Sequence, residues 1–253
     1  MEILGRIDTF ITWFDGVVWG LPLIILILVT GIFLTVRLGL LQVRYLGKAL
    51  KFMVKNEEDG HGEVTSFGAL CTALSATIGT GNIVGVATAI SAGGPGALFW
   101  MILTAFLGMA TKYSEGLLAV KYRTIDEDGH VLGGPFYYIE NGMGVKFRWL
   151  AKIFAFFGAG VGLFGIGTFT QVNGISSAVR NFFDPNMAHT VALFGNDYSW
   201  ATVISCLVLT VCVGMVVLGG IKRIAKVSEI VVPFMAVLYV VLAVIIMVTN
   251  ITA

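Results

Sequence analysis

The chain has 253 residues, of which 57% are hydrophobic and 12% are charged, and its formal net charge at pH 7 is +1. Soluble domains carry about 25% charged residues, so this composition excludes an ordinary soluble protein. A nearly neutral chain also lacks the basic face that nucleic acids require. The composition therefore predicts an integral membrane protein.

The first 19 residues are too mixed in polarity to cross a bilayer. The aromatic residues Trp13, Phe14 and Trp19 share this segment with Asp8 and Asp15. This mixture of aromatic and charged residues suits an amphipathic helix that lies in the membrane interface. We therefore expect residues 1–19 to form an interfacial amphipathic segment.

Six later segments are apolar enough to cross a bilayer as helices, each of which needs about 20 residues. They are 20–39, 66–91, 97–120, 150–180, 200–219 and 227–249. The fourth is longer than one crossing requires, so we expect a single tilted helix there. The sequence thus predicts an all-α polytopic membrane protein.

The distribution of lysine and arginine predicts how these spans are oriented. Of the 16 basic residues, only Arg6 and Arg180 fall outside the loops and helix ends that follow the first, third and fifth spans. Positively charged loops stay on the cytoplasmic side of a membrane. We therefore expect a multi-pass protein of the cell inner (plasma) membrane, with both termini outside.

The sequence gives no indication of an enzyme or of a metal centre built from side chains. Cys71, Cys206 and Cys212 lie in apolar stretches without a paired spacing, and the three histidines fall in separate loops. The spans contain no nucleophile with a nearby base. We therefore expect no covalent catalysis and no catalytic residues.

The second span is interrupted at its middle by the polar sequence "GTGN", residues 79–82. One interpretation is packing, because small residues such as Gly81 and Gly85 let helices approach closely in lipid. The other is a discontinuous helix, since two glycines lower helix propensity by about 2 kcal/mol relative to alanine. The unwound backbone must then line a cavity, where one helix end attracts a cation and the other an anion. This interpretation predicts a midplane site for a small zwitterion and a cation.

Several stretches of the chain are similar to one known family. Three of them, between residues 62 and 144, read "TALSATIGTGNIVGVATAISAGGPGALFWM", "GMATKYSEGLLAVKYR" and "GGPFYYI". A fourth stretch, in the fourth span, reads "GIGTFTQVNGISSAV". Together they resemble the alanine/glycine:sodium symporter (amino acid carrier) family. The resemblance implies a sodium-coupled symporter for alanine, glycine or similar small neutral amino acids.

The resemblance also implies a fold. The family is similar to the leucine-transporter fold, in which two five-helix repeats are inverted in the membrane. On that likeness, residues 20–39 form an extra transmembrane helix and residues 66–249 form the five-helix first repeat of the transporter core. We expect the chain to be the N-terminal half of the symporter, which needs its C-terminal half or a partner subunit.

The same likeness assigns residues to the substrate. The backbone amides of Thr80 and Gly81 would face the substrate carboxylate, and Asn82 would lie near the substrate or an ion. Gln171 resembles the family glutamine that reaches the polar end of the substrate. An interhelical hydrogen bond with a purely structural role is an equally good interpretation of Gln171.

The cation assigned by the resemblance is sodium. The backbone carbonyls of Ser75 and Ile78, just before the break, would face this ion. The break itself would be made by Gly79 and Gly81.

One alternative belongs to a different class of protein. A non-transporting six-span membrane scaffold, or a subunit of a split transporter, would share the composition and the spans. A pure scaffold has little use for a helix break in lipid. The sequence therefore favours the symporter and leaves the alternative open.

Overall fold

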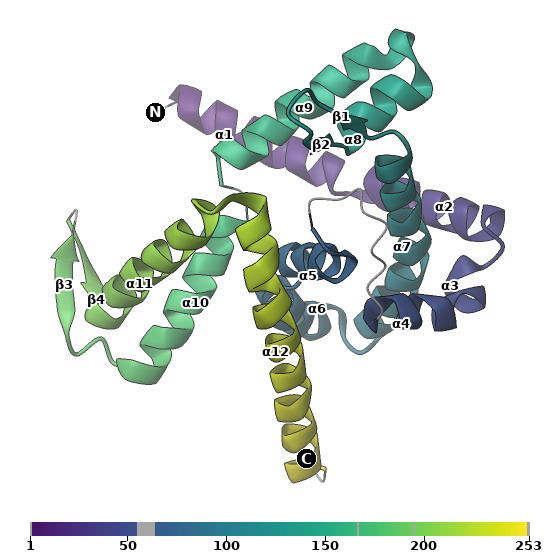
Figure 1. The fold of residues 1–253 in the computed structure, drawn as a ribbon. Helices are drawn as coiled ribbons and strands as arrows, with labels where there is room; N and C mark the ends of the chain where they lie inside the picture. The colour runs from purple at the N-terminus through teal and green to yellow at the C-terminus, as the bar shows by residue number, and fades with distance from the viewer. Residues whose placement is uncertain (1, 55–63, 166, 194, 252–253) are drawn as a thin grey trace. The chain divides into compact units, whose positions relative to one another are not determined.

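The computed structural model describes residues 2–54, 64–165, 167–193 and 195–251. Most of its elements are helices, and the others are four short strands (Figure 1). The chain divides into two units, one made of residues 1–51 and 89–154 and the other of residues 52–88 and 155–253. Each unit is described by itself.

The first unit is organised around two long helices and the short elements that follow them. Its N-terminal part holds α1 (Glu2–Val18), α2 (Leu21–Arg37), α3 (Leu41–Arg44), most of α4 (Leu46–Val54) and α7 (Gly96–Lys121). A Cβ added at Gly31 of α2 would lie 2.8 Å from the Cβ of Leu107 of α7, so glycine permits this close approach. The buried Gln42 amide donates to Thr35 Oγ1 at 2.8 Å and to the Phe106 carbonyl at 3.1 Å, which ties α3 to both helices.

The rest of the first unit is a set of short elements after α7. They are β1 (Thr124–Ile125), β2 (Val131–Leu132), α8 (Pro135–Tyr137), the π-helix η2 (Tyr138–Gly142), the 3-10 helix η3 (Val145–Phe147) and the start of α9 (Arg148–Leu163). β1 and β2 pair in an antiparallel hairpin, with Thr124 opposite Leu132. Arg148 forms an ion pair with Glu140 at 2.9 Å, which ties the start of α9 to η2.

The second unit contains the interrupted span and three longer helices. Its elements are α5 (Ser66–Thr77), the π-helix η1 (Gly81–Gly85), the start of α6 (Val86–Gly93), the end of α9, α10 (Thr168–Phe183), β3 (Thr190–Leu193), β4 (Asn196–Ser199), α11 (Trp200–Val217) and α12 (Gly220–Thr249). α12 packs along α5 and α11, and α10 packs along α11. β3 and β4 form an antiparallel hairpin between α10 and α11.

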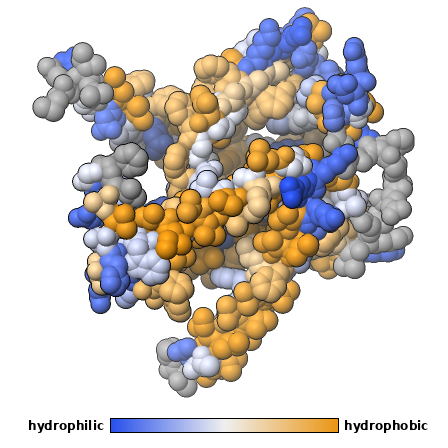
Figure 2. Space-filling view, turned by 60° about the vertical axis from the view of Figure 1, so that its left-hand side comes forward, coloured by the Kyte–Doolittle hydropathy of each residue, from blue (hydrophilic) through white to orange (hydrophobic). Residues whose placement is uncertain are grey.

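The helices fit a membrane protein. By length and composition, five of the described segments are suited to crossing a bilayer, or six if α5 and the bent continuation after it count as one span. Figure 2 shows hydrophobic side chains over much of the surface, including most of the visible length of α12 at the bottom of the view. Lipid rather than water covers such a surface in a membrane. The prediction of an all-α polytopic membrane protein is thereby confirmed, with two small hairpins in its loops.

The single tilted helix expected over residues 150–180 is wrong. Two helices, α9 and α10, occupy this segment, although together they still qualify as one spanning segment. The linker between them contains Gly165 at φ +59° and Gly167 at φ +90°. L-residues with a side chain rarely adopt these angles, so the glycines allow the helix to stop and restart.

The outer limits of the other predicted spans lie close to the observed helices. α7 and α11 match 97–120 and 200–219 to within two residues. α12 starts seven residues before the predicted 227–249 and carries Pro233 inside it. The interfacial placement of residues 1–19 stays a prediction, although α1 covers most of that segment.

Candidate functional site

The interruption of the second span is a real break in the helix. α5 ends at Thr77, and Ile78 turns the chain out of the helix with φ −86° and ψ 120°. The chain resumes helical structure at Gly81 in η1. The direction of the helix axis changes by 58° across the break. Neither Gly79 nor Gly81 has a positive φ, so a left-handed backbone is not the reason for glycine at these positions.

Asn82 closes the break across its own loop. Its side-chain oxygen accepts a hydrogen bond from the Gly79 N–H at 3.1 Å, while its own N–H donates to the Gly79 carbonyl at 3.1 Å. Asparagine side chains commonly satisfy nearby backbone groups in this way. The Asn82 oxygen, which the sequence places near a ligand, is thus engaged by the break itself in this structure.

Gln171 reaches the break from α10. Its Oε1 accepts a hydrogen bond from the Thr80 N–H at 2.9 Å. A Cβ added at Gly79 would collide with the Gln171 amide group, so glycine at this position gives the amide room to approach the break as it does here. The structure therefore brings together Thr80 and Gln171, two of the residues predicted from the sequence. The Thr80 amide, expected to face a carboxylate, is held here by the Gln171 oxygen.

One side of the break is covered and the other is open. Gly79, Thr80 and Gln171 are half-buried, whereas Gly81 and Asn82 are exposed. A Cβ added at Gly81 would meet no atom within 4 Å. The break therefore has open space beside Gly81, where η1 begins.

The carbonyl end of α5 is the second feature of the break. The Ile78 N–H donates to the Leu74 carbonyl at 2.8 Å, and this is the last regular helical hydrogen bond of α5. Within the described ranges, no hydrogen bond is made to the backbone carbonyls of Ser75, Thr77 or Ile78. Free carbonyls at a helix C-terminus carry the negative end of the helix dipole and attract a cation.

A hydroxyl from α12 lies beside this carbonyl end. The Oγ of Ser228 is 3.4 Å from the Oγ of Ser75, which also donates to the Thr72 carbonyl at 2.7 Å. No group of three or more His, Cys, Asp or Glu side chains that could hold a metal ion occurs in the part of the chain that the structure describes. The oxygens around the break are thus neutral carbonyls and hydroxyls, which suit a hard cation of low charge.

The start of α5 is fastened to α12 by residues that the sequence analysis missed. Thr65 caps α5 by accepting a hydrogen bond from the Gly68 N–H at 2.9 Å, and its hydroxyl donates to Glu229 Oε1 at 2.7 Å. A Cβ at Gly68 would lie 2.5 Å from the same Glu229 oxygen. Threonine just before an apolar run is a helix-cap signal that could have indicated the first bond.

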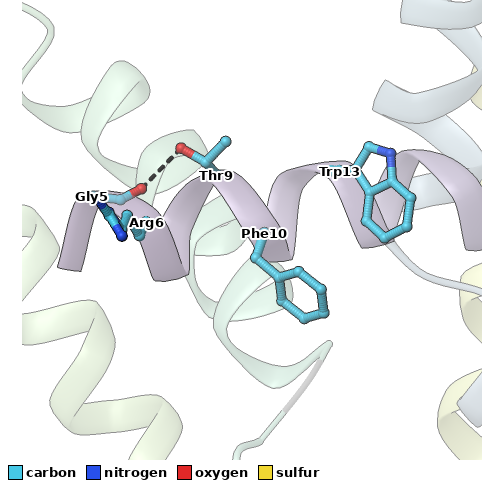
Figure 3. Close-up of a pocket in the computed structure, with 5 residues that line it drawn as sticks. All are labelled: Gly5, Arg6, Thr9, Phe10 and Trp13. Carbon is cyan, nitrogen blue, oxygen red and sulfur yellow. Dashed lines mark hydrogen bonds between the residues drawn. The ribbon is translucent and has the colours of Figure 1, made fainter. Parts of the chain in front are cut away.

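A separate hollow lies on α1 (Figure 3). It is lined by Gly5, Arg6, Thr9, Phe10 and Trp13, and Thr9 donates to the Gly5 carbonyl at 2.8 Å. All of these residues belong to one helix, so they form a face rather than an enclosure. Ligand sites usually surround most of a small molecule, and the break is the better candidate.

Comparisons with known proteins bear on the chain as a whole. A family model described as the sodium:alanine symporter family matches residues 4–253. An uncharacterized transporter of Haemophilus influenzae is 52% identical, with 97% of this chain and 50% of the relative aligned. The sodium/alanine symporter AgcS of Methanococcus maripaludis is 46% identical, with 99% of this chain and 52% of the relative aligned.

A third relative carries a different description of the coupling ion. The putative sodium/proton-dependent alanine carrier protein YrbD of Bacillus subtilis is 39% identical, with 96% of this chain and 46% of the relative aligned. The chain therefore spans about half the length of the curated relatives that it matches.

Proposed function

Because this chain belongs to the sodium:alanine symporter family, whose members are transporters rather than enzymes, we propose that it takes part in sodium-coupled symport of alanine, glycine or a similar small neutral amino acid. The observation that carries the proposal is the break between α5 and η1, with Gln171 bonded to the Thr80 amide. Polar backbone exposed within a spanning segment is tolerated where it lines a cavity, and such breaks are where transporters bind their cargo.

The substrate side of the proposed site is the start of η1. The amino acid carboxylate would accept hydrogen bonds from the N–H groups of Thr80 and Gly81. Asn82 would hold the loop in shape, and Gln171 would contact the polar end of the substrate. The open side of the break at Gly81 supports this placement, because it leaves space beside the N–H groups.

The sodium side of the proposed site is the end of α5. The ion would be held by the backbone carbonyls of Ser75 and Ile78, which accept no hydrogen bond among the described residues. A sodium ion there would lie within one helix turn of the carboxylate site. Each ligand would then raise the affinity of the other by the same factor, and this coupling is the basis of symport.

The wider architecture is also a proposal. Residues 1–19 would form an interfacial segment, 20–39 the extra helix and 66–249 the five-helix first repeat of a leucine-transporter fold, with both termini outside. The chain covers about half of the length of these relatives, and in this proposal it corresponds to their N-terminal half. The opposite wall of the site would come from the C-terminal half or from a partner subunit.

The test is binding and uptake of labelled alanine by this chain. The purified protein is assayed for alanine binding with sodium and with potassium, and proteoliposomes are assayed for uptake with and without an inward sodium gradient. We expect sodium-dependent binding that Asn82→Ala weakens and Gly81→Leu abolishes, because leucine would fill the open side of the break. Gly214→Ala, at a helical site in α11 with nothing within 4 Å of its Cβ, is the matched control.

The outcomes separate the proposal from its alternative. Binding without uptake fits a chain that supplies one wall of the site. Sodium-dependent binding that is unchanged in both break variants would refute the placement of the site. Absence of any sodium-dependent binding by folded wild-type protein would favour a non-transporting scaffold or subunit.

A further inference from the structure

Two residues of the break interlock with two residues of α10. Gln171 and Gly174 are three positions apart, so they lie on the same face of that helix. Gly79 lies directly against the Gln171 amide, and a Cβ at Gly174 would lie 2.6 Å from the Cγ2 methyl of Thr80. A glycine of the break thus faces a side chain of α10, and a glycine of α10 faces a side chain of the break.

The interlock fixes a hydrogen bond as well as a packing distance. Ordinary van der Waals contact begins at about 3.4 Å and the distance here is 2.6 Å, so an added methyl group at Gly174 would require the Thr80 methyl and α10 to move apart by about 0.8 Å. The bond from the Thr80 N–H to Gln171 Oε1 is 2.9 Å long. A displacement of that size would take it beyond normal hydrogen-bond length.

We propose that Gly174 is a positioning residue of the substrate site. Because it has no side chain, the Thr80 methyl can pack against α10, and this contact keeps the Thr80 N–H within hydrogen-bond distance of the Gln171 oxygen. This inference rests on the proposed function. In this structure the Gln171 oxygen lies on the Thr80 amide where the proposal places a carboxylate oxygen. A backbone N–H donates one proton, so an incoming carboxylate must take it over from Gln171. The Gln171 NH₂ group is then free to donate to the same carboxylate.

The exchange has a consequence for selectivity. The bond to Gln171 satisfies the Thr80 amide, so this donor of the break is not left unpaired. A ligand without a carboxylate cannot displace the Gln171 oxygen by forming a stronger, charge-assisted bond. Gly174 therefore contributes to selectivity for carboxylates although it contacts no ligand.

The test is a double-mutant cycle in the full chain, with Gly174→Ala, Thr80→Ser and the two combined. Serine lacks the Cγ2 methyl that the new alanine Cβ would strike and keeps the backbone N–H and the hydroxyl. Hydrogen–deuterium exchange at the residue 80 amide is measured without ligand, and binding of labelled alanine is measured with sodium.

With Thr80 in place, we expect Gly174→Ala to speed exchange at residue 80 about two- to tenfold. We expect it to weaken alanine binding by a similar factor, because the bond from the Gln171 NH₂ group to the carboxylate, lost in the bound state, is charge-assisted and stronger than the Gln171–Thr80 bond lost in the free state. In the Thr80→Ser background, the same change should have little effect on either quantity. Gly214→Ala is again the matched control and should change neither.

Three results would overturn the inference. The first is an equal effect of Gly174→Ala in both backgrounds, and the second is no effect in either. The third is faster exchange throughout the protein instead of at residue 80, because that would indicate general destabilisation. If the proposed function is wrong, the wild type would bind no alanine. The hydrogen–deuterium exchange rates of the four proteins would still show whether Gly174 maintains the hydrogen bond between Gln171 and Thr80.

Discussion

The break between α5 and η1 and the break between α9 and α10 both interrupt apolar segments of the second unit, but they are held differently. The first has no positive φ and is bridged by the side chains of Asn82 and Gln171. The second has Gly165 and Gly167 at positive φ, and its described hydrogen bonds are local, such as those from the Thr168 N–H to the Gly165 carbonyl at 3.0 Å and from the Thr170 hydroxyl to the Gly167 carbonyl at 2.8 Å.

This difference separates two uses of glycine in a membrane helix. At the α9–α10 break, glycine supplies a backbone conformation, and the consequences of changing it are local. At the α5–η1 break, Gly79 supplies the space that another helix needs to reach the backbone. A change at the second kind of glycine therefore disturbs a contact between helices, and that contact lies where the ligand is proposed to bind.

The largest expected effect is that of Gly79→Ala. The new methyl group would overlap the Gln171 amide and displace it from the Thr80 N–H, and the loss of that hydrogen bond costs about 1 kcal/mol. We expect a lower midpoint of thermal unfolding together with a loss of sodium-dependent alanine binding of about tenfold or more. Both are measured on the purified chain, with Gly214→Ala as the control. Normal alanine affinity in Gly79→Ala would show that the approach of Gln171 is unimportant for binding.

Asn82→Ala is expected to have the next largest effect. It removes the acceptor of the Gly79 N–H and leaves that donor unpaired at the break, which costs about 1–2 kcal/mol. Asn82→Asp keeps an acceptor oxygen of the same size and is the matched comparison. The midpoint of thermal unfolding should fall clearly in Asn82→Ala and less in Asn82→Asp. Equal losses would mean that the hydrogen bond to Gly79 does not stabilise the break.

Gly167→Ala tests the other side of the comparison. At φ +90° an alanine is strained, and the expected cost is about 1 kcal/mol of unfolding free energy. The affinity for the substrate alanine should change little, because the Gly167 carbonyl, which accepts a hydrogen bond from the Gln171 N–H at 3.1 Å, is kept in this variant. Gly160→Ala, inside α9 with open space around its Cβ, should be neutral or slightly stabilising. A fall in alanine affinity for Gly167→Ala would show that both breaks serve the site.

The sequence predicted the break at residues 79–82 because glycine, threonine and asparagine are out of place in an apolar run. It did not predict the α9–α10 break, because its glycines are equally typical of helix packing in lipid. The approach of Gln171 to the break was suggested by the family resemblance alone, and residue spacing gave no indication of it. The Gly174–Thr80 contact and the Thr65–Glu229 bond join residues far apart in the chain, so no local pattern contains them.

The smallest expected effect concerns the far end of α10. Asp184 accepts hydrogen bonds from Ser199 Oγ at 2.6 Å and from the Ala188 N–H at 2.7 Å, and these bonds, with the Ser199 bond the main cause, lower the pKa of its carboxyl group. A carboxyl whose pKa is lower in the folded state stabilises the fold above its unfolded pKa of about 3.9. That contribution is lost as the pH falls through the lower, folded pKa.

Thermal unfolding of the wild type should therefore become easier as the pH falls from 6 to about 3, and Asp184→Asn should flatten this dependence. Asp197→Asn, at an exposed position in β4 of the same hairpin, is the control and should leave the dependence as it is. An identical acid dependence in all three proteins would exclude Asp184 as a source of it. Alanine binding near neutral pH should be unchanged in Asp184→Asn. The contacts of α10 with the break are made by Gln171 and Gly174, and Asp184 lies at the far end of this helix.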